Sequence, residues 1–120
     1  MAINAKPSSD NYVRVYDIEK AFDGEAVDSI TSVVASIRAY SEDSAGKPQP
    51  GAEVSGSAVS LTAVTSEPTA YEGVIPASVT LVNGTRYFLK IVTTAVVEGT
   101  SRVLTEHHLF TADQSKPRTF

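Results

Sequence analysis

Residues 27–40 carry the feature that most constrains the fold, a run in which apolar and polar side chains alternate. From residue 33 to residue 39 every second position is a small or β-branched apolar residue, namely Val33, Ala35, Ile37 and Ala39. Successive side chains of an extended strand point to opposite faces, so this period of two predicts a strand with one buried face. Ala and Ile also suit a helical spacing, but the β-branched content and the lack of a helix cap favour a strand.

The alternation is equally clear in residues 85–95, where one side is lined by Tyr87, Leu89, Ile91 and Thr93. Glu98-Gly99 then forms a hairpin turn that sends the chain back antiparallel. About seven short strands are expected in all, at residues 12–17, 27–40, 57–65, 70–75, 85–95 and 102–111, with short edge pairing around residues 52–54. Short strands separated by turn signals at this spacing are typical of an all-β sandwich.

Residues 41–56 interrupt this pattern with a long turn region. They include Gly46, Pro48, Pro50 and Gly51. Proline removes a ladder donor and glycine permits positive φ, so we expect no central strand to run through this region.

Composition narrows the class of protein. The chain has 120 residues, of which 42% are apolar and 20% charged, which fits one globular domain rather than a disordered or membrane-spanning chain. Its net charge of -4 is spread along the chain, and this argues against a nucleic-acid partner, which requires clustered Lys and Arg. With no cysteine, the chain has neither disulfides nor thiolate metal sites, and this suits folding in a reducing cytoplasm. No apolar run long enough for a signal peptide or a membrane span is visible.

The two ends of the chain are polar. Residues 1–11 and 113–120 are predicted to be flexible arms around a domain that spans residues 12–112, because their small and polar side chains can bury little surface. Such arms either dangle in solvent or become ordered on a neighbouring molecule, and the sequence leaves both interpretations open.

The segment from Leu81 to Tyr87 combines a Leu, a turn Gly and a Tyr. Gly84 can make the tight turn, and Tyr87 can bury its ring while its hydroxyl bonds back to the corner backbone. This segment resembles the corner between strands E and F of fibronectin type III and related immunoglobulin-like (Ig-like) domains. The resemblance implies a single Ig-like β-sandwich in which Leu81, Gly84 and Tyr87 are structural corner residues.

A second resemblance concerns the turn Asp43-Ser44-Ala45-Gly46-Lys47-Pro48, followed by Gly51-Ala52, which is similar to turns in many bacterial and phage Ig-like modules. The whole layout is similar to small virion proteins of tailed phages, among them capsid decoration (minor capsid) proteins and Ig-like domains of head–tail, tail and baseplate components. Antibody-type domains are excluded because the chain lacks cysteine and Trp. The resemblance implies a non-enzymatic virion protein, folded in the bacterial host cytoplasm, that binds the major capsid protein or another virion protein in multiple copies, with a homo-oligomer left open.

Several tyrosines are candidates for the contact surface. They lie on the opposite side of their strands from the aliphatic residues, together with two arginines, so one sheet face is expected to carry Tyr12, Arg14, Tyr16, Arg38 and Tyr40. Tyrosine is enriched in protein interfaces because it buries much area and keeps a hydroxyl for bonding. Ordinary cross-strand pairing explains the same residues, and both interpretations stay open.

Residues that often carry catalysis or bind metals are sparse. His107 and His108 are neighbours on a predicted strand, so they point to opposite faces, and only Glu106 shares a face with His108. Ser55-Gly56-Ser57 superficially suggests a nucleophile elbow but reads better as a flexible turn. The acidic groups Asp17, Asp23 and Glu25, and separately Glu42 and Asp43, lack the alternation of a calcium loop and read as solvated turns.

Two functions from different classes follow. The leading hypothesis is a non-enzymatic phage virion structural protein, a capsid decoration or cement (minor capsid) protein or a head–tail component, that acts by protein–protein contacts without cofactor, nucleic acid or membrane. The alternative is a carbohydrate- or cell-surface-binding Ig-like module, although such modules usually use an exposed aromatic platform and the chain has no Trp.

Overall fold

The computed structural model of the chain describes residues 10–16 and 27–113. Strands make up 69% of these residues and none of them is helical, so the protein is all-β, as predicted. Eight strands follow one another along the chain: β1 (Asn11–Val15), β2 (Val27–Glu42), β3 (Pro48–Glu53), β4 (Val59–Ser60), β5 (Thr62–Val64), β6 (Glu67–Ile75), β7 (Arg86–Val97) and β8 (Thr100–Thr111).

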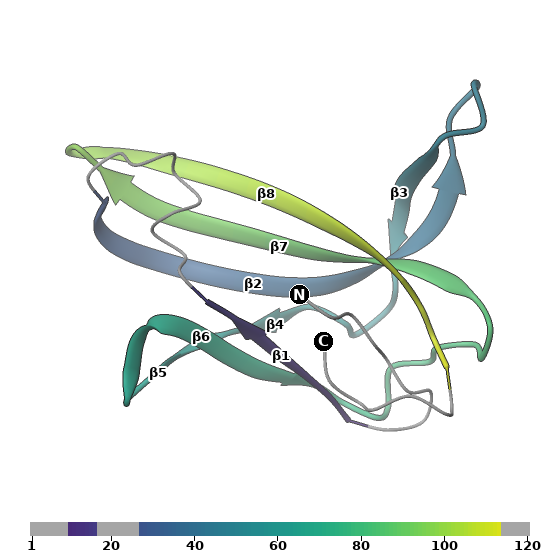
Figure 1. Cartoon of the computed structure of the whole chain (residues 1–120), viewed down its shortest axis with the longest axis horizontal. Helices are drawn as coiled ribbons and strands as arrows, with labels where there is room; N and C mark the ends of the chain where they lie inside the picture. The colour runs from purple at the N-terminus through teal and green to yellow at the C-terminus, as the bar shows by residue number, and fades with distance from the viewer. Residues whose placement is uncertain (1–9, 17–26, 114–120) are drawn as a thin grey trace.

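The strands form two antiparallel sheets. The large sheet has the order β3-β2-β7-β8, with β4 also paired to β2, and the small sheet has the order β1-β6-β5. In Figure 1 the large sheet runs across the upper part of the molecule and the small sheet lies below it. Strands that are neighbours in a sheet are therefore often distant in sequence, as with β1 and β6.

The core lies between the two sheets. Val13 of β1 and Ile75 of β6 pack in the same cluster as Ile37 of β2 and Leu89 of β7, and each of these side chains is at most 1% exposed. The predicted alternation is confirmed from Val33 to Ile37 and from Tyr87 to Ile91, because every second side chain there enters this cluster. Register shifts between β2 and β7 interrupt the alternation at residues 27–32.

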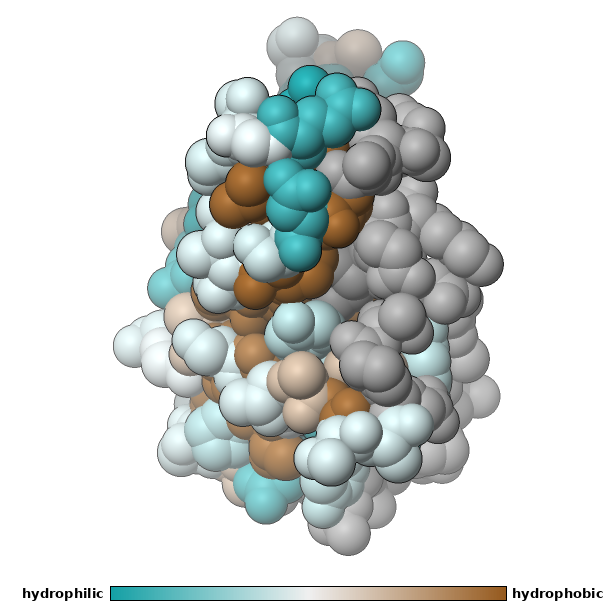
Figure 2. Space-filling model, turned by 90° about the vertical axis from the view of Figure 1, so that its left-hand side faces the viewer, coloured by the Kyte–Doolittle hydropathy of each residue, from teal (hydrophilic) through white to brown (hydrophobic). Residues whose placement is uncertain are grey.

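A second, smaller cluster lies on the large sheet near the β7–β8 turn. Buried Ala95 and Val97 pack there against half-buried Val27, Ile30 and Leu104. Figure 2 views the end of the molecule where this turn lies and shows hydrophobic atoms reaching the surface between polar ones.

The strand predicted at residues 57–65 is divided in two. β4 pairs with β2 of the large sheet, whereas β5 pairs with β6 of the small sheet. Leu61 stands at the crossing, where its N–H donates to the carbonyl oxygen of Val33 at 2.7 Å and its side chain is buried. Gly73 leaves room for that side chain, since a Cβ at Gly73 would lie 2.7 Å from Leu61 Cδ2. The chain therefore has eight described strands rather than seven.

The turn region predicted at residues 41–56 is shorter than expected. β2 continues to Glu42 and β3 returns beside it, so the two strands form a hairpin that projects from the body of the molecule (Figure 1). Pro48 and Pro50 are tolerated in β3 because it is an edge strand, where only one side of the backbone needs donors.

The predicted arms fall mainly outside the described residues. Asn11 was placed in the N-terminal arm, but it begins β1 and is 2% exposed. Beside it, the Asp10 carboxylate accepts a hydrogen bond from Ala77 N–H at 2.8 Å. Among the described residues, no helix has the length and apolar character to cross a membrane.

Candidate interaction surface

The outer side of the small sheet presents aromatic side chains to solvent. Val13 points into the core, so the alternation of β1 turns Tyr12 and Arg14 outward, and Tyr16 follows directly after the strand. Tyr12 is 45% exposed and Tyr16 is 56% exposed. Val74 lies opposite Tyr12 on β6 and is also exposed. We call this surface the tyrosine face and define it by Tyr12, Arg14, Tyr16, Thr62, Glu72 and Val74.

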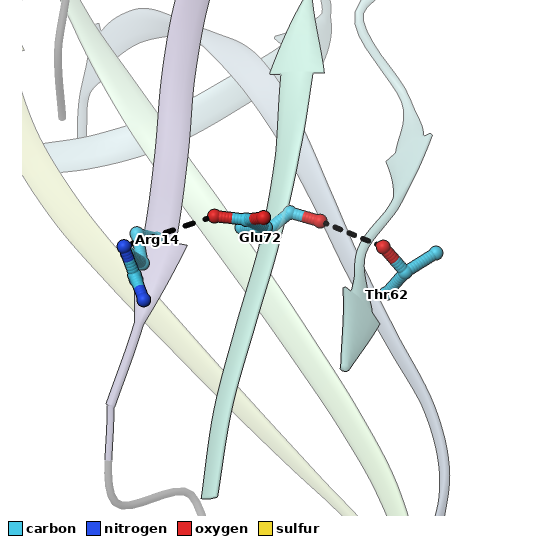
Figure 3. A network of polar contacts seen from close by, with 3 residues as sticks. All are labelled: Arg14, Thr62 and Glu72. Atoms are coloured by element: carbon cyan, nitrogen blue, oxygen red, sulfur yellow. Dashed lines mark hydrogen bonds and ion pairs between the residues drawn. The ribbon is translucent and has the colours of Figure 1, made fainter. Parts of the chain in front are cut away.

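Polar contacts cross all three strands of the tyrosine face (Figure 3). Nη1 of Arg14 lies 3.9 Å from Oε2 of Glu72, and the Thr62 hydroxyl donates to the Glu72 carbonyl oxygen at 3.5 Å. The Arg14 guanidinium also lies 5.3 Å from the centroid of the Tyr16 ring. An exposed ion pair of this kind adds about 0–1 kcal/mol to stability, so its main effect is to orient Arg14 between the two tyrosines.

The centre of the tyrosine face is an open depression of about 510 Å³. The side chains of Tyr12, Arg14, Thr62, Glu72 and Val74 line it. Its lining combines an aromatic ring, an aliphatic side chain and one charge of each sign. Such a surface can receive side chains of a protein partner, because interfaces favour Tyr and Arg.

The prediction that Tyr12, Arg14, Tyr16, Arg38 and Tyr40 share one sheet face is wrong. Arg38 and Tyr40 belong to β2 in the large sheet, whereas β1 belongs to the small sheet. Both β1 and β2 turn their aliphatic residues into the same core. The outward residues of β1 and those of β2 therefore lie on opposite outer sides of the molecule. Alternation within a strand reveals which residues face outward, but it does not reveal the sheet to which the strand belongs.

Arg38 and Tyr40 instead link β2 to its neighbours β3 and β7 within the large sheet. Nε of Arg38 donates to the Gly51 carbonyl oxygen at 2.7 Å. The Tyr40 ring stacks on Phe88 with centroids 6.2 Å apart, and the Arg86 guanidinium lies 4.2 Å from the Tyr40 centroid. These contacts make both residues structural.

The Tyr40 hydroxyl donates to Oε1 of Glu42 at 2.9 Å. Desolvation raises the pKa of Tyr40, and the hydrogen bond to Glu42 raises it further. The hydroxyl therefore remains a proton donor at neutral pH, and it links the outer end of β2 to the aromatic stack.

The corner residues lie in the connection between β6 and β7 and at the start of β7. Leu81 and Tyr87 are both 7% exposed and belong to the core cluster, while Gly84 has a φ of 82° that favours glycine. The expected hydrogen bond is present, since Val82 N–H donates to the Tyr87 hydroxyl at 2.8 Å.

The two histidines lie on opposite sides of β8, as predicted. Nε2 of His108 is 3.4 Å from Oε2 of Glu106, and the His107 and Phe88 rings form a T-shaped pair on the outer side of the large sheet, with centroids 6.3 Å apart. Desolvation lowers the pKa of His107, and the charges of Lys90, Arg38 and His108 lower it further.

Ser57 ends the predicted turn, because its N–H donates to the Val54 carbonyl oxygen at 3.1 Å across Ser55 and Gly56. Its side chain is fully buried, and its hydroxyl accepts a hydrogen bond from Ile37 N–H at 2.9 Å and donates to the Ile37 carbonyl oxygen at 3.2 Å. The hydroxyl thus occupies the position of a neighbouring strand's backbone and satisfies β2 between β4 and β3.

The acidic candidates do not converge on a cation site. Asp43 Oδ1 accepts hydrogen bonds from Ala45 N–H and Lys47 N–H, each at 2.9 Å, so it caps the hairpin turn. Asp17, Asp23 and Glu25 lie outside the described residues. Within residues 10–16 and 27–113, no group of three His, Asp or Glu side chains is placed to hold a metal ion.

Four residues of these sites were not predicted from the sequence. Thr62, Glu72 and Val74 belong to the tyrosine face, and Phe88 stacks on Tyr40. The first three join the tyrosine face only through the pairing of β1, β5 and β6. Alternation places Phe88 on the outer side of its strand, opposite the side of Tyr87 and Leu89, but its burial at 7% exposure comes from Tyr40 and His107 on neighbouring strands. The missing information was the strand pairing, which alternation alone does not contain.

Comparison of the chain with protein-family models, with curated proteins and with solved structures gives no match.

Proposed function

We propose that the chain is an Ig-like β-sandwich domain. The large-sheet order β3-β2-β7-β8 corresponds to C′-C-F-G of the Ig fold, and the small-sheet order β1-β6-β5 corresponds to B-E-D. The assignment keeps the Ig order along the chain, with β1 as strand B and β8 as strand G. Strand A has no counterpart among the described residues.

The corner between β6 and β7 supports the same assignment. Tyr87 lies at the start of the strand that corresponds to F, and its hydroxyl bonds to the backbone five residues upstream. Ig-like domains often carry such a tyrosine, two residues before the cysteine of the inter-sheet disulfide. Leu89 occupies that later position and is fully buried, so apolar packing stands where antibody domains have a disulfide.

We propose further that the protein is a non-enzymatic structural component of a tailed-phage virion, acting by contact with the major capsid protein or another virion protein. The observation that carries the contact role is the tyrosine face, where Tyr12 and Tyr16 are exposed beside the Arg14–Glu72 ion pair. The assignment to a virion draws on the resemblance of the cysteine-free Ig-like layout to small phage proteins.

The non-enzymatic part of the proposal draws on what the candidate chemical groups do. Ser57 is bonded to the backbone of β2, and Asp43 caps a turn. His107 packs against Phe88, while His108 pairs with Glu106 on the other side of the strand. Each group has a structural use.

Electron microscopy and mass spectrometry of particles assembled from the phage genes that include this coding sequence test the proposal. We expect the chain to be a multi-copy component whose tyrosine face lies against a capsid, head–tail or tail subunit. Tyr12→Ser combined with Tyr16→Ser should release the protein from particles, whereas Val82→Ser, at an exposed site outside the strands, should leave it bound. Particles that lack the wild-type chain would contradict the virion role, and tyrosine-dependent binding to a glycan would favour the carbohydrate-binding alternative.

A further inference from the structure

Strand β8 is a long and regular edge of the large sheet. Among the described residues it pairs only with β7, in a register that runs without a shift from Thr111 opposite Arg86 to Thr100 opposite Val97. In an antiparallel strand, every second residue turns its N–H and C=O away from the paired neighbour. An edge of this kind is a template on which another strand can form hydrogen bonds.

The other described edges are short or interrupted. β3 contains Pro48 and Pro50, and its register with β2 shifts between Arg38 and Tyr40. β1 has five residues and β5 has three. β8 has 12 residues, with neither proline nor bulge, so two of the devices by which proteins prevent edge pairing are absent from it.

The side chains of β8 also favour contact. Val103 is 63% exposed and Leu109 is 42% exposed, and both point to the outer side of the large sheet. A single exposed valine requires no explanation, but one in the middle of a long, regular edge strand gives a second strand an apolar side chain to cover.

We propose that two copies of the chain associate by antiparallel pairing of β8 with β8, about a two-fold axis through Leu104. This symmetry places residue 104 + n of one copy opposite residue 104 − n of the other. Arg102 then lies opposite the partner's Glu106, and Glu106 lies opposite the partner's Arg102. Arg102, Leu104 and Glu106 share one face of β8, so two ion pairs flank a Leu104–Leu104 contact.

Neighbouring two-fold registers are less favourable. An axis through Glu106 sets two carboxylates against each other. An axis through Thr105 sets Leu104 against the partner's Glu106. The register through Leu104 instead pairs opposite full charges twice and sets Val103 beside the partner's Thr105, a pair of β-branched residues that suits adjacent strands.

The paired edges would join the two large sheets into one continuous sheet and would leave the tyrosine face of each copy free. The inference therefore goes beyond the proposed function. A dimer that presents two tyrosine faces would bind a repeating surface more tightly than one copy does, because the second contact is intramolecular.

Sedimentation equilibrium of the full chain, at concentrations up to about 1 mM so that weak association is also detected, tests the proposal. We expect a dimer. Arg102→Glu and Glu106→Arg should each weaken it by about tenfold or more, since each creates like-charge pairs, and the double variant should restore it to within about threefold of the wild type.

Two lysine variants test the register independently of the charge exchange. Val103→Lys lies within the paired residues 100–108 and should yield a monomer, whereas Leu109→Lys, on the same strand but outside them, should keep the dimer. Both side chains are solvent-exposed, so neither change disturbs the core, and circular dichroism checks the fold. A monomeric wild-type chain, a dimer that survives Val103→Lys, or a double charge variant without rescue would each overturn the proposal. Binding to particles is measured separately, so it can fail while the dimer stands.

Discussion

Ser57 is a polar residue in a turn, yet its side chain stabilises the centre of the large sheet. Its buried hydroxyl serves both the N–H and the carbonyl oxygen of Ile37, in the centre of β2. Replacement by alanine leaves a buried N–H without a partner, which should lower the free energy of unfolding by about 1–3 kcal/mol. Urea denaturation measures the change, with Ser55→Ala at a nearby exposed position as the control. Equal stability of the two variants would show that the buried hydroxyl is dispensable.

Tyr87 ties the β6–β7 connection to the core through one hydrogen bond. Tyr87→Phe keeps the buried ring and removes only the acceptor for Val82 N–H. We expect a loss of about 0.5–1.5 kcal/mol in the free energy of unfolding. Tyr71→Phe is the matched control, because the Tyr71 hydroxyl makes no hydrogen bond with another described residue. An unchanged denaturation midpoint for Tyr87→Phe would argue against the corner role.

His107 should make stability depend on pH. Desolvation, with the charges of Lys90 and Arg38, lowers its pKa below the ordinary value of 6.5. Between the lowered and the ordinary pKa the unfolded chain binds more protons than the folded chain, so stability rises with pH in this range and falls as the pH drops below about 6.5. NMR titration of the His107 imidazole should give a midpoint below 6.5, and His107→Gln should weaken the pH dependence of the melting temperature. A midpoint above 6.5 would reverse the argument.

Among the elements, the β2–β3 hairpin depends on a few side-chain contacts beyond the body of the sheet. Arg38→Ala removes the hydrogen bond to the Gly51 carbonyl oxygen. Because β3 contacts only β2 in its sheet, we expect faster amide exchange in β3 with a change of about 1 kcal/mol or less in global stability. Lys90→Ala, at a half-buried cation on the same side of the sheet, should leave β3 exchange unchanged. If β3 exchanges at the wild-type rate in Arg38→Ala, the tether is not needed.

The elements also show how far the sequence predicts the structure. Alternation identified the strands that became β2 and β7, and it identified their buried sides, because hydrophobic burial acts on every second residue. It missed the break at Leu61, where the chain passes from one sheet to the other, and the outer end of β2, whose neighbour β3 contains prolines. It also placed Tyr12 beside Tyr40, since the sheet to which a strand belongs is decided by long-range pairing.

At the scale of the whole molecule, the two candidate contact surfaces belong to different sheets. The tyrosine face lies on the outer side of the small sheet, and the β8 edge borders the large sheet. Neither requires the other, so association between copies and contact with a different partner can occur together. Both follow from one arrangement, in which β1 and β6 of the small sheet cover the apolar side of β2 and β7.

Nuclear Overhauser contacts between methyl groups test this arrangement most directly. The two-layer account predicts contacts that link Val13 and Ile75 of the small sheet to the cluster around Ile37 and Leu89 of the large sheet. It also predicts that no contact joins the rings of Tyr12 and Tyr40. Contacts between those two rings, with none between the two sets of core methyl groups, would contradict the account.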